Sequence, residues 1–471
     1  MREQRVQASK LYEQGEENMK KMLKAFVIAA ALSAAGALTA AAANGWTQEN
    51  GQWVYYDRDS KVYNEWKTAA DGTWYYLGNN GYMAVNSFVD DERYVGSDGR
   101  MLTNRWQQIE GKWYYFDNNG KTSRNRARQI DGSWYYFDDN GAMQTGWVED
   151  DGGYYYYDPN GGKMVSATWK RLAPMEDAVY DEDAASPMEN SDGTYWFYFQ
   201  ASGKAASASG NGNYKEYTVN GNRYCFDEYG RMMTGWVKVD DSKSPVIAGY
   251  KYYNDTESIG TYGAAHVGWL SAYAPENEQG FSGEVEWFYF DSKGTPAYGT
   301  NISDNDDDET LQAKFKRLQK NGKTQTYLFN EYGNPVYGLR KVKKTGGEVT
   351  SMYFGTRQES CLQLGDKNIT DADGVTSQFY FDNRGYGYTG EKNGKLYYMG
   401  KLQRASDDSY AYFTVNGKTY LVNKSGQIKK NYNKSKDPDE VEYRSNASGL
   451  KDGGNASDSE LEVPAFMTSV Y

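Results

Sequence analysis

Short aromatic runs separated by polar turns recur along the chain. In Gly132–Trp147, the first and third rings of the block Trp-Tyr-Tyr-Phe (134–137) fall on one face of an extended strand, and the second and fourth fall on the other. Aromatic residues favour strands, and the Asp-Asn-Gly that follows tolerates the backbone angles of a turn. The pattern predicts a strand, a turn and the start of the next strand. Because a lone hairpin is marginally stable in water, this unit needs copies stacked against it.

Copies of the unit recur about every 20 residues. The aromatic block begins at residues 53, 74, 94, 113, 134 and 154, in steps of 21, 20, 19, 21 and 20. A second landmark, which we call the post-turn ring, follows the turns at Trp46, Trp66, Phe88, Trp106 and Trp147. A fixed period of this length is typical of stacked repeats. The sequence therefore predicts an all-β fold, an elongated solenoid (superhelix) of stacked β-hairpins.

Aromatic side chains must supply most of the core of these hairpins. Tyr, Trp and Phe make up 16% of the residues, whereas the mean hydropathy is −0.88. Rings on one strand face suffice for packing between neighbouring hairpins. Strand alternation then forces the other ring set outward or into the grooves between repeats. Exposed rings of this kind are typical of binding surfaces.

The N-terminal residues have the pattern of a secretory signal peptide. Lysines at 20, 21 and 24 precede an apolar run at 25–38, and small residues follow at 41–43. We therefore expect an N-terminal extension and signal peptide at 1–43, with Met19 as the true start. The apolar run has about 14 residues, too few to span a bilayer comfortably, so we expect no transmembrane segment in the mature chain.

The rest of the chain divides into three predicted regions. All 13 Trp lie between Trp46 and Trp287, which defines Trp-bearing repeats at 44–300. Altered hairpins with Asn-Gly turns continue as degenerate, Trp-free repeats at 301–432. Ser, Asn, Asp, Lys and Gly dominate the remainder, which predicts a polar, disordered tail at 433–471.

Charge and titratable residues narrow the possible functions. The net charge of −12 makes nucleic acid an unsuitable partner, because phosphate binding needs basic patches. The single histidine, His266, leaves no His-rich metal set or triad, and no metal or cofactor is predicted. Cys225 and Cys361 are 136 residues apart and are expected to be unpaired thiols, since stacked repeats contact mainly their neighbours. We predict that the chain is not an enzyme.

The repeat resembles the cell-wall-binding repeats of Gram-positive bacteria. The signature is Gly-Trp, about six residues, then Trp-Tyr-Tyr-Phe-Asp-x-x-Gly-x-Met-x-Thr-Gly-Trp, and the best matching stretches are 106–117, 134–147 and 227–236. This family includes choline-binding modules, the glucan-binding repeats of glucansucrases and the C-terminal repeats of large clostridial toxins. The resemblance implies a superhelix of hairpins. In the choline-binding members, it also implies cages of rings that hold a trimethylammonium group.

Carried over to this chain, the resemblance implies cage walls made of post-turn and block rings. The expected pairs are Trp46 with Trp53, Trp66 with Trp74, Trp106 with Trp113, and Trp147 with Tyr155. Trp134 fits the block position, but Ala127 stands where its partner Trp is expected. Trp236 follows a full copy of the motif, and the family Met corresponds to Met83, Met101, Met143 and Met232. Such a Met floors a cage or fills a gap.

Two ligands remain open from the residues alone. A choline-bearing cell-wall teichoic acid needs closed cages of rings. A glucan polysaccharide needs flat ring platforms with polar neighbours for its hydroxyls, and Asp117, Asn119, Asp138 and Asn140 could supply them. We therefore predict a secreted, cell-wall-associated protein that binds choline-substituted polymer non-covalently, or alternatively a glucan-binding repeat protein or adhesin.

Overall fold

The computed structural model describes residues 44–175, 192–208, 214–275, 283–299, 308–406, 410–435 and 441–467. The predicted signal peptide therefore lies outside the described residues. The chain divides into two compact units, Met1–Val148 with Tyr156–Met164, and Glu149–Tyr155 with Val165–Tyr471. In the described part of the chain, no helix is long and apolar enough to cross a membrane.

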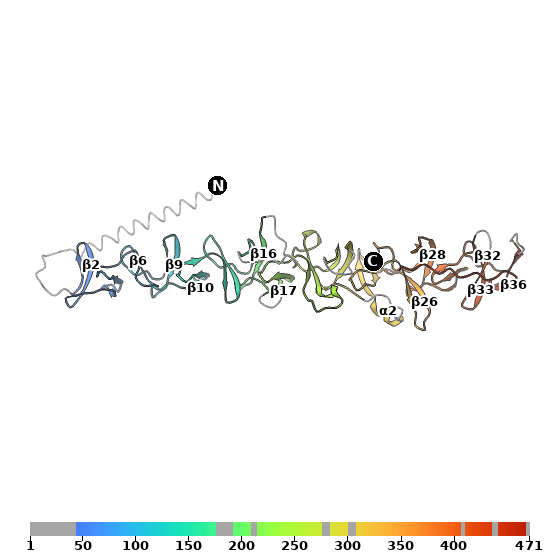
Figure 1. The fold of residues 1–471 in the computed structure, drawn as a ribbon, viewed down its shortest axis with the longest axis horizontal. Coiled ribbons are helices and arrows are strands. Elements are labelled where there is room, and N and C mark those ends of the chain that lie inside the picture. The colour runs from blue at the N-terminus through green and yellow to red at the C-terminus, as the bar shows by residue number, and fades with distance from the viewer. Residues whose placement is uncertain are drawn as a thin grey trace. The chain divides into compact units, whose positions relative to one another are not determined.

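Antiparallel hairpins follow one another through the first unit (Figure 1). Each hairpin is a sheet of two or three strands. In chain order the strands are β1 (Gly45–Glu49), β2 (Gln52–Asp57) and β3 (Ser60–Lys61); β4 (Glu65–Thr68) and β5 (Trp74–Leu77); β6 (Ser87–Phe88) and β7 (Tyr94–Val95); β8 (Arg105–Ile109) and β9 (Lys112–Phe116); β10 (Arg126–Ile130), β11 (Ser133–Phe137) and β12 (Met143–Gln144). A further hairpin pairs β13 (Gly146–Asp150) with β14 (Gly153–Tyr157).

The second unit continues with two-stranded hairpins as far as β26. They are β15 (Thr168–Leu172) with β16 (Tyr195–Phe199); β17 (Tyr214–Val219) with β18 (Asn222–Asp227); β19 (Gly235–Lys238) with β20 (Tyr250–Tyr253); β21 (Gly268–Tyr273) with β22 (Val285–Phe290); β23 (Lys316–Lys320) with β24 (Lys323–Tyr327); and β25 (Leu339–Lys343) with β26 (Val349–Tyr353). The short helices of this unit are η2 (Val246–Gly249), η3 (Glu257–Ile259) and α2 (Asp308–Lys314). The predicted all-β fold of stacked hairpins is confirmed.

The last part of the second unit departs from simple hairpins. A five-stranded sheet runs in the order β27-β28-β31-β30-β29. Its strands are β27 (Gly365–Thr370), β28 (Thr376–Phe381), β29 (Gly390–Lys392), β30 (Lys395–Tyr398) and β31 (Lys401–Leu402), and the hairpin β32 (Tyr410–Val415) with β33 (Lys418–Asn423) follows it.

The segment predicted as a disordered tail at 433–471 contains a sheet. β34 (Tyr432–Ser435), β35 (Glu442–Ser445) and β36 (Lys451–Gly454) form three antiparallel strands. The expectation of disorder followed from polar composition, which gave no weight to Tyr443 in the tail or to Tyr432 just before it. Tyr432 and Tyr443 pack against the neighbouring hairpin, with ring centroids 4.5 and 6.0 Å from that of Tyr410. These contacts supply the apolar surface that the composition hides.

A carboxylate or amide after the block fixes the turn in most repeats. The Oδ1 atom of Asp227 accepts hydrogen bonds from the backbone N–H groups of residues 229 and 231, at 3.1 and 2.7 Å. Asp138, Asp291, Asp382, Asn330 and Asn423 accept the same two bonds, from the second and fourth residues that follow each of them. This is why the motif reads Phe-Asp-x-x-Gly: the side chain replaces missing backbone partners in the turn.

The two ring sets of each block separate as alternation requires. The second and fourth block positions form the core: Tyr114 and Phe116 in β9, and Phe197 and Phe199 in β16, are buried. The first and third positions of these two strands are exposed or half-buried. In β20 the corresponding rings, Tyr250 and Tyr252, are buried instead. The outward ring set predicted from the sequence is therefore present in β9 and β16.

A segment after β36 runs back across earlier strands of the same unit. Ser459 donates its backbone N–H to Tyr412 O at 2.7 Å, and Glu462 and Gln403 exchange two hydrogen bonds. Further along, the Met467 N–H donates to Leu339 O at 3.0 Å. Phe466 packs on the cluster that includes Leu339, Ile369 and Phe379. We call residues 459–467 the return segment.

Candidate functional site

The post-turn Trp of one hairpin packs against the next hairpin. The indole of Trp169 lies 4.8 Å from the ring of Tyr224 and stacks at 5.8 Å and 27° on Phe226. Trp106 repeats this geometry on Tyr135 at 4.8 Å and on Phe137 at 5.7 Å and 26°; Trp269 repeats it on Tyr327 at 4.7 Å and on Phe329 at 6.0 Å and 26°. We call each such contact between consecutive hairpins a junction and name it by its post-turn ring.

Backbone carbonyls of the following hairpin also hold several of these indoles. The Nε1–H group of Trp269 donates to Gln319 O at 2.8 Å, and that of Trp236 donates to Tyr273 O at 2.7 Å. Trp46 makes the corresponding bond to Thr68 O at 3.4 Å. The indole N–H of each of these three residues is thereby satisfied.

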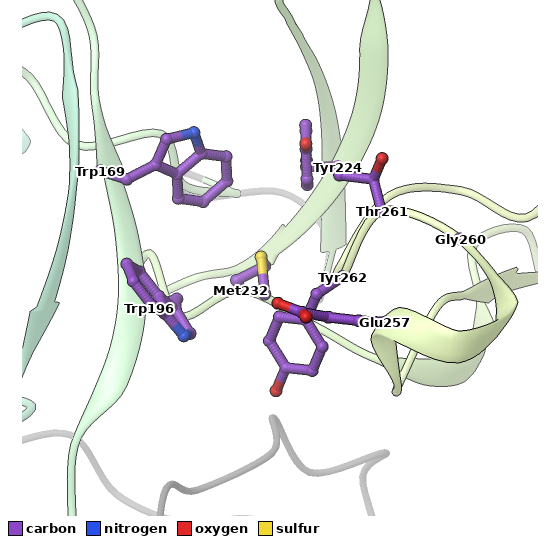
Figure 2. A pocket seen from close by; sticks show the side chains of 8 residues that line it. All are labelled: Trp169, Trp196, Tyr224, Met232, Glu257, Gly260, Thr261 and Tyr262. Carbon is purple, nitrogen blue, oxygen red and sulfur yellow. The ribbon is translucent and has the colours of Figure 1, made fainter.

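The Trp169 junction opens into a pocket. It has a volume of about 590 Å³ and is lined by Trp169, Trp196, Tyr224, Met232, Glu257, Gly260, Thr261 and Tyr262. In Figure 2 the two indoles and the phenol of Tyr224 surround the sulfur of Met232. Trp169 and Trp196 come from one hairpin, β15–β16, while Tyr224 and Met232 come from the next hairpin and its following turn. The pocket exists only because the two hairpins are stacked.

Met232 forms the floor because its backbone is tied across the junction. Its N–H donates to Trp196 O at 2.9 Å, and the residue is buried. A turn glycine from the next repeat lies directly beneath it: a Cβ on Gly263 would stand 2.3 Å from the sulfur. The φ of Gly263 is 73°, a backbone conformation that favours glycine.

A loop between β20 and β21 supplies the polar side of the pocket. Glu257 and Tyr262 project from it, and Glu257 is exposed. Asn254, which is buried, anchors the loop by donating from Nδ2 to Thr261 O at 3.0 Å. Burial raises the pKa of the Tyr262 hydroxyl, and the nearby Asp255 charge adds to this shift. The loop therefore adds a carboxyl group and a second phenol to the pocket lining.

His266 supports this loop and takes no part in the pocket lining. Its Nδ1 lies 2.7 Å from Asn254 Oδ1, and its Nε2 lies 3.2 Å from Trp269 O. Burial lowers the pKa of the imidazole. The hydrogen bonds and burial of His266 are those of a structural residue. Cys225 and Cys361 are both free and buried.

The geometry suits a cation that cannot donate hydrogen bonds. The faces of Trp169, Trp196 and Tyr224 present electron-rich π-surface to one space, and the Met232 sulfur is polarizable. Glu257 adds a negative charge at the rim. Trp169 and Tyr224 meet at 63° and form a corner, not a flat platform. Among the described residues, no group of three or more His, Cys, Asp or Glu is arranged to hold a metal ion.

Of the predicted site residues, those of the Trp106 junction come together most completely. Trp106 packs on Tyr135, Trp113 is 43% exposed at the first block position of the same hairpin, and β12 with Met143 contacts β9. A side chain of the next hairpin contacts the third block ring at this junction: the guanidinium of Arg128 lies 5.3 Å from the ring centre of Tyr115.

The Trp46 junction has the same construction. Trp46 packs on Tyr75 of the next hairpin at 5.3 Å, and Met83 donates its N–H to Trp53 O at 2.8 Å. Register places Tyr55 opposite Trp46 and places Trp53 two residues nearer the turn. Lys67 Nζ lies 5.3 Å from the centre of the Tyr55 ring.

The Trp66 junction lacks its third ring. Trp66 packs on Tyr76 of its own hairpin at 5.2 Å, and Trp74 is 46% exposed. Phe88 pairs with Tyr94, which puts Tyr94 at the third block position and leaves Arg93 at the second. The guanidinium of Arg93 donates a hydrogen bond to Asp90 Oδ2 at 2.7 Å, so it does not serve as a wall of a cation cage.

The remaining predicted residues differ in their surroundings. Ala127 pairs with Tyr136, so it does occupy the post-turn position beside Trp134, which is 42% exposed. Trp147 makes a ring contact with Tyr156 of its own hairpin at 5.3 Å, whereas Tyr155 lies on the other face of β14.

Trp236 lies in an apolar environment. It packs against the buried cluster that contains Ile247, Phe288 and Phe290, with the ring centre of Phe288 at 4.9 Å. We expect this indole to contribute packing.

The sequence analysis predicted Met232 and missed the other seven lining residues of the pocket: Trp169, Trp196, Tyr224, Glu257, Gly260, Thr261 and Tyr262. Trp169 and Trp196 hold the post-turn and first block positions, but they are 27 residues apart, whereas the predicted pairs are 7 or 8 apart. Aligning the blocks by their final Phe-x-x-x-Gly signature instead of by fixed spacing would have paired them. Glu257 and Tyr262 lie in a non-periodic insertion and gave no signal.

Replacing Gly263 by alanine tests the role of Met232 as the floor. The new Cβ would collide with the thioether and push it into the pocket, so tetramethylammonium affinity is expected to fall roughly 3–10-fold, equivalent to about 1 kcal/mol. Gly221→Ala is the matched control, because Gly221 also has positive φ but a Cβ there would have nothing within 4 Å of it. Both variants should lose about 1 kcal/mol of stability. Equal cation affinity in both would contradict the role of Met232.

Three segments of this chain match two known families of repeats. Residues 43–88 and 127–169 match the family described as choline-binding repeat, and residues 104–121 match the one described as putative cell wall binding repeat. These three segments therefore match choline-binding and cell-wall-binding repeat families, as predicted from the signature.

Individual relatives cover different shares of the chain. Glucosyltransferase-S of Streptococcus downei is 34% identical over 86 residues, which are 17% of this chain and 6% of that protein. Solved structures from Streptococcus pneumoniae include choline binding protein F (19% identity, 71% of this chain, 100% of that chain, TM-score 0.40) and the modular autolysin LytC (18%, 63%, 54%, 0.35). The chain thus spans about half of the autolysin and a small part of the glucosyltransferase.

Proposed function

We propose that these repeats bind a cell-wall polymer non-covalently, and that the Trp169 pocket receives a quaternary ammonium group of the kind found in choline-substituted teichoic acid. The observation that carries this proposal is the convergence of three ring faces and a thioether on one space, with a carboxylate at the rim. A quaternary ammonium cannot donate hydrogen bonds, so ring faces are its natural partners, each contributing about 0.5–2 kcal/mol.

The affinity of one such pocket is low, and the array compensates for this. Three walls together give roughly 2–5 kcal/mol, which corresponds to a dissociation constant in the millimolar range. The Trp46 and Trp106 junctions have the same three-ring construction as the Trp169 pocket. Several weak sites on one chain bind a polymer about 10²–10⁴-fold more tightly than one site does. We infer that retention at the wall depends on the number of sites.

We further propose that the protein is secreted and acts by binding, without catalysis. The charge and hydropathy pattern of residues 20–43 supports secretion. The pocket lining includes one carboxylate, Glu257, whereas acid–base hydrolysis of glycosides uses a pair.

Choline and its neutral isostere 3,3-dimethyl-1-butanol separate charge from shape. Titrated into the purified protein and followed by tryptophan fluorescence, choline is expected to saturate in the millimolar range. The alcohol has the same shape without the charge, so it should bind at least about tenfold more weakly. Equal binding of the two compounds would mean that the pocket recognises apolar shape and that the proposal is wrong.

Two tryptophans at equivalent block positions provide matched variants. Trp196→Leu removes a wall while Trp169 keeps its stacking on Phe226, so choline affinity should fall about 2–30-fold. Trp74→Leu is the control, since its junction has Arg93 in place of the third ring, and choline affinity should not change.

A second candidate ligand is a glucan. The indoles of Trp74, Trp113 and Trp134 are 46%, 43% and 42% exposed, which suits stacking on sugar rings. If a glucan is the ligand, Trp74→Leu should weaken retention on a dextran column, and free choline should not elute the protein. Elution by choline with no dextran retention would favour the cation.

A further inference from the structure

The Trp269 junction reproduces the rings of the Trp169 pocket. Trp269 is the post-turn ring, Trp287 holds the first block position of the same hairpin, and Tyr327 comes from the next hairpin. The two indoles lie 6.2 Å apart at 81°, and Tyr327 lies 4.7 Å from Trp269. All three walls of a cation cage are therefore present.

The side chain of Lys320 occupies the space between these walls. Its Nζ atom lies 3.7 Å from the ring centre of Trp287 and 4.7 Å from that of Trp269. The atom is buried and has no hydrogen-bond acceptor among the described residues. An ammonium normally donates three hydrogen bonds, so a buried one without acceptors is costly unless ring faces compensate. Burial lowers the pKa of this lysine, in keeping with that environment.

Lys320 is the last residue of β23, and the backbone of this strand positions its side chain. Gln319, its neighbour in β23, accepts the Nε1–H of Trp269 at 2.8 Å, and this bond fixes the strand against the indole. Lys320 itself pairs with Lys323 across the hairpin, just before the Asn321-Gly322 turn. The lysine is thus presented to the rings by an ordered strand.

The floor of this junction differs from that of the Trp169 pocket. Phe329 pairs with Pro335 where Phe226 pairs with Met232, so proline replaces the thioether. Proline lacks an N–H, and the side chain of Asn334 donates to Trp287 O at 3.4 Å instead. The junction keeps its hydrogen bond but loses the methionine floor.

We propose that the Trp269 junction is a cation cage filled by the chain's own Lys320, which closes it to outside ligands and joins β21–β22 to β23–β24 without any ligand. The inference rests on the proposed function in treating both junctions as cation cages. A tethered group acts at an effective concentration in the millimolar range or above. An outside cation with millimolar affinity competes poorly against it, so this cage remains latent while the Trp169 pocket is open.

Fluorine NMR of the full chain labelled with 5-fluorotryptophan tests this with tetramethylammonium as the probe. Single Trp→Phe variants assign the resonances. In the wild-type protein we expect the probe to shift the resonances of Trp169 and Trp196 and to leave those of Trp269 and Trp287 unchanged. In Lys320→Ala the latter two should also shift, because the cage is empty. Lys320→Met is the matched control, since its thioether chain still fills the cage, and no gain is expected.

Each outcome bears on one proposal or the other. If Trp169 responds but Trp269 and Trp287 stay unchanged in Lys320→Ala, the latent cage is refuted while the proposed function stands. If Trp169 never responds, the proposed function fails, and a response of Trp269 in Lys320→Ala alone still supports the latent cage. A response of Trp269 and Trp287 in the wild-type protein equal to that in Lys320→Ala refutes the closure by Lys320.

A measurement on the unaltered protein guards against variants that do not fold. In competitive acetylation followed by mass spectrometry, Lys320 should react at least about tenfold more slowly than Lys323, its exposed cross-strand partner. Equal rates for the two lysines would place the Lys320 ammonium in water and overturn the proposal.

Discussion

Phe226→Ala is expected to lower the local stability of the β17–β18 hairpin by about 3–5 kcal/mol. The ring of Phe226 is fully buried; Trp169 stacks on it from the preceding hairpin, and Tyr217 contacts it from its own. Removing it leaves a cavity at the base of the junction. Native-state hydrogen exchange of the amides in β17 and β18 is the suitable measurement, because a repeat array does not unfold as a single two-state unit.

An exposed ring serves as the control for this substitution. Tyr273→Ala removes a side chain that is 65% exposed, so exchange in β21 and β22 should change by no more than about 0.5 kcal/mol. Equal effects of Phe226→Ala and Tyr273→Ala would show that the buried block positions are not the source of hairpin stability.

Asp227→Ala is expected to have a comparable effect by a different mechanism. Its Oδ2 accepts a bond from Arg231 Nε at 2.6 Å, with side chains that are 8% and 6% exposed respectively. Its Oδ1 closes the turn with two backbone bonds. Removing the carboxylate takes the opposite charge away from a buried guanidinium, which costs about 3–5 kcal/mol. Hydrogen exchange of β18 and of the turn after it would measure the loss.

Another repeat suggests how to rescue this variant. Asn330 makes the same two backbone bonds as Asp227, and Asn334 stands where Arg231 does. The double variant Asp227→Asn with Arg231→Asn should therefore recover to within about 1–2 kcal/mol of the wild-type protein. An exposed pair, Glu92 with Lys121 at 2.5 Å, provides the comparison, and Glu92→Ala should cost less than about 1 kcal/mol. A loss at Asp227 no larger than that at Glu92 would refute the buried-pair argument.

The hairpins were predictable because the turn residues and the alternation of inward and outward side chains lie within the sequence of each hairpin. Asn321, Asn393 and Asn416 precede glycine, and each has positive φ in the structure, as Asn-Gly hairpin turns require. The hairpins beyond Trp287 persist because buried aliphatic residues such as Leu328 and Val342 replace rings in the core. The five-stranded sheet and β34–β36 were not predicted, since their pairings link segments that share no periodic signal.

The site was predictable only within one hairpin. Post-turn and block tryptophans are visible in the sequence as a repeating pair. The third wall is contributed by the following hairpin, so Tyr224 becomes a pocket residue only through stacking and register. The same limit applies to Lys320, whose position over Trp287 follows from a contact between β22 and β23. Spacing cannot distinguish an open cage from one that the chain fills itself.

The return segment affects how the second unit folds during synthesis and how it unfolds locally. Hairpins that contact only their neighbours can form one after another as the chain emerges, and can peel off one at a time from an edge. The return segment, residues 459–467, bonds to Tyr412, Gln403 and Leu339. These contacts can form only after the more than one hundred residues between Leu339 and the return segment have been synthesised. Once these contacts have formed, we expect local unfolding of β34–β36 to be coupled to local unfolding of β25. A protease that cuts between Gly454 and Ser459 would detach the return segment from β36, and the hairpins would then unfold separately.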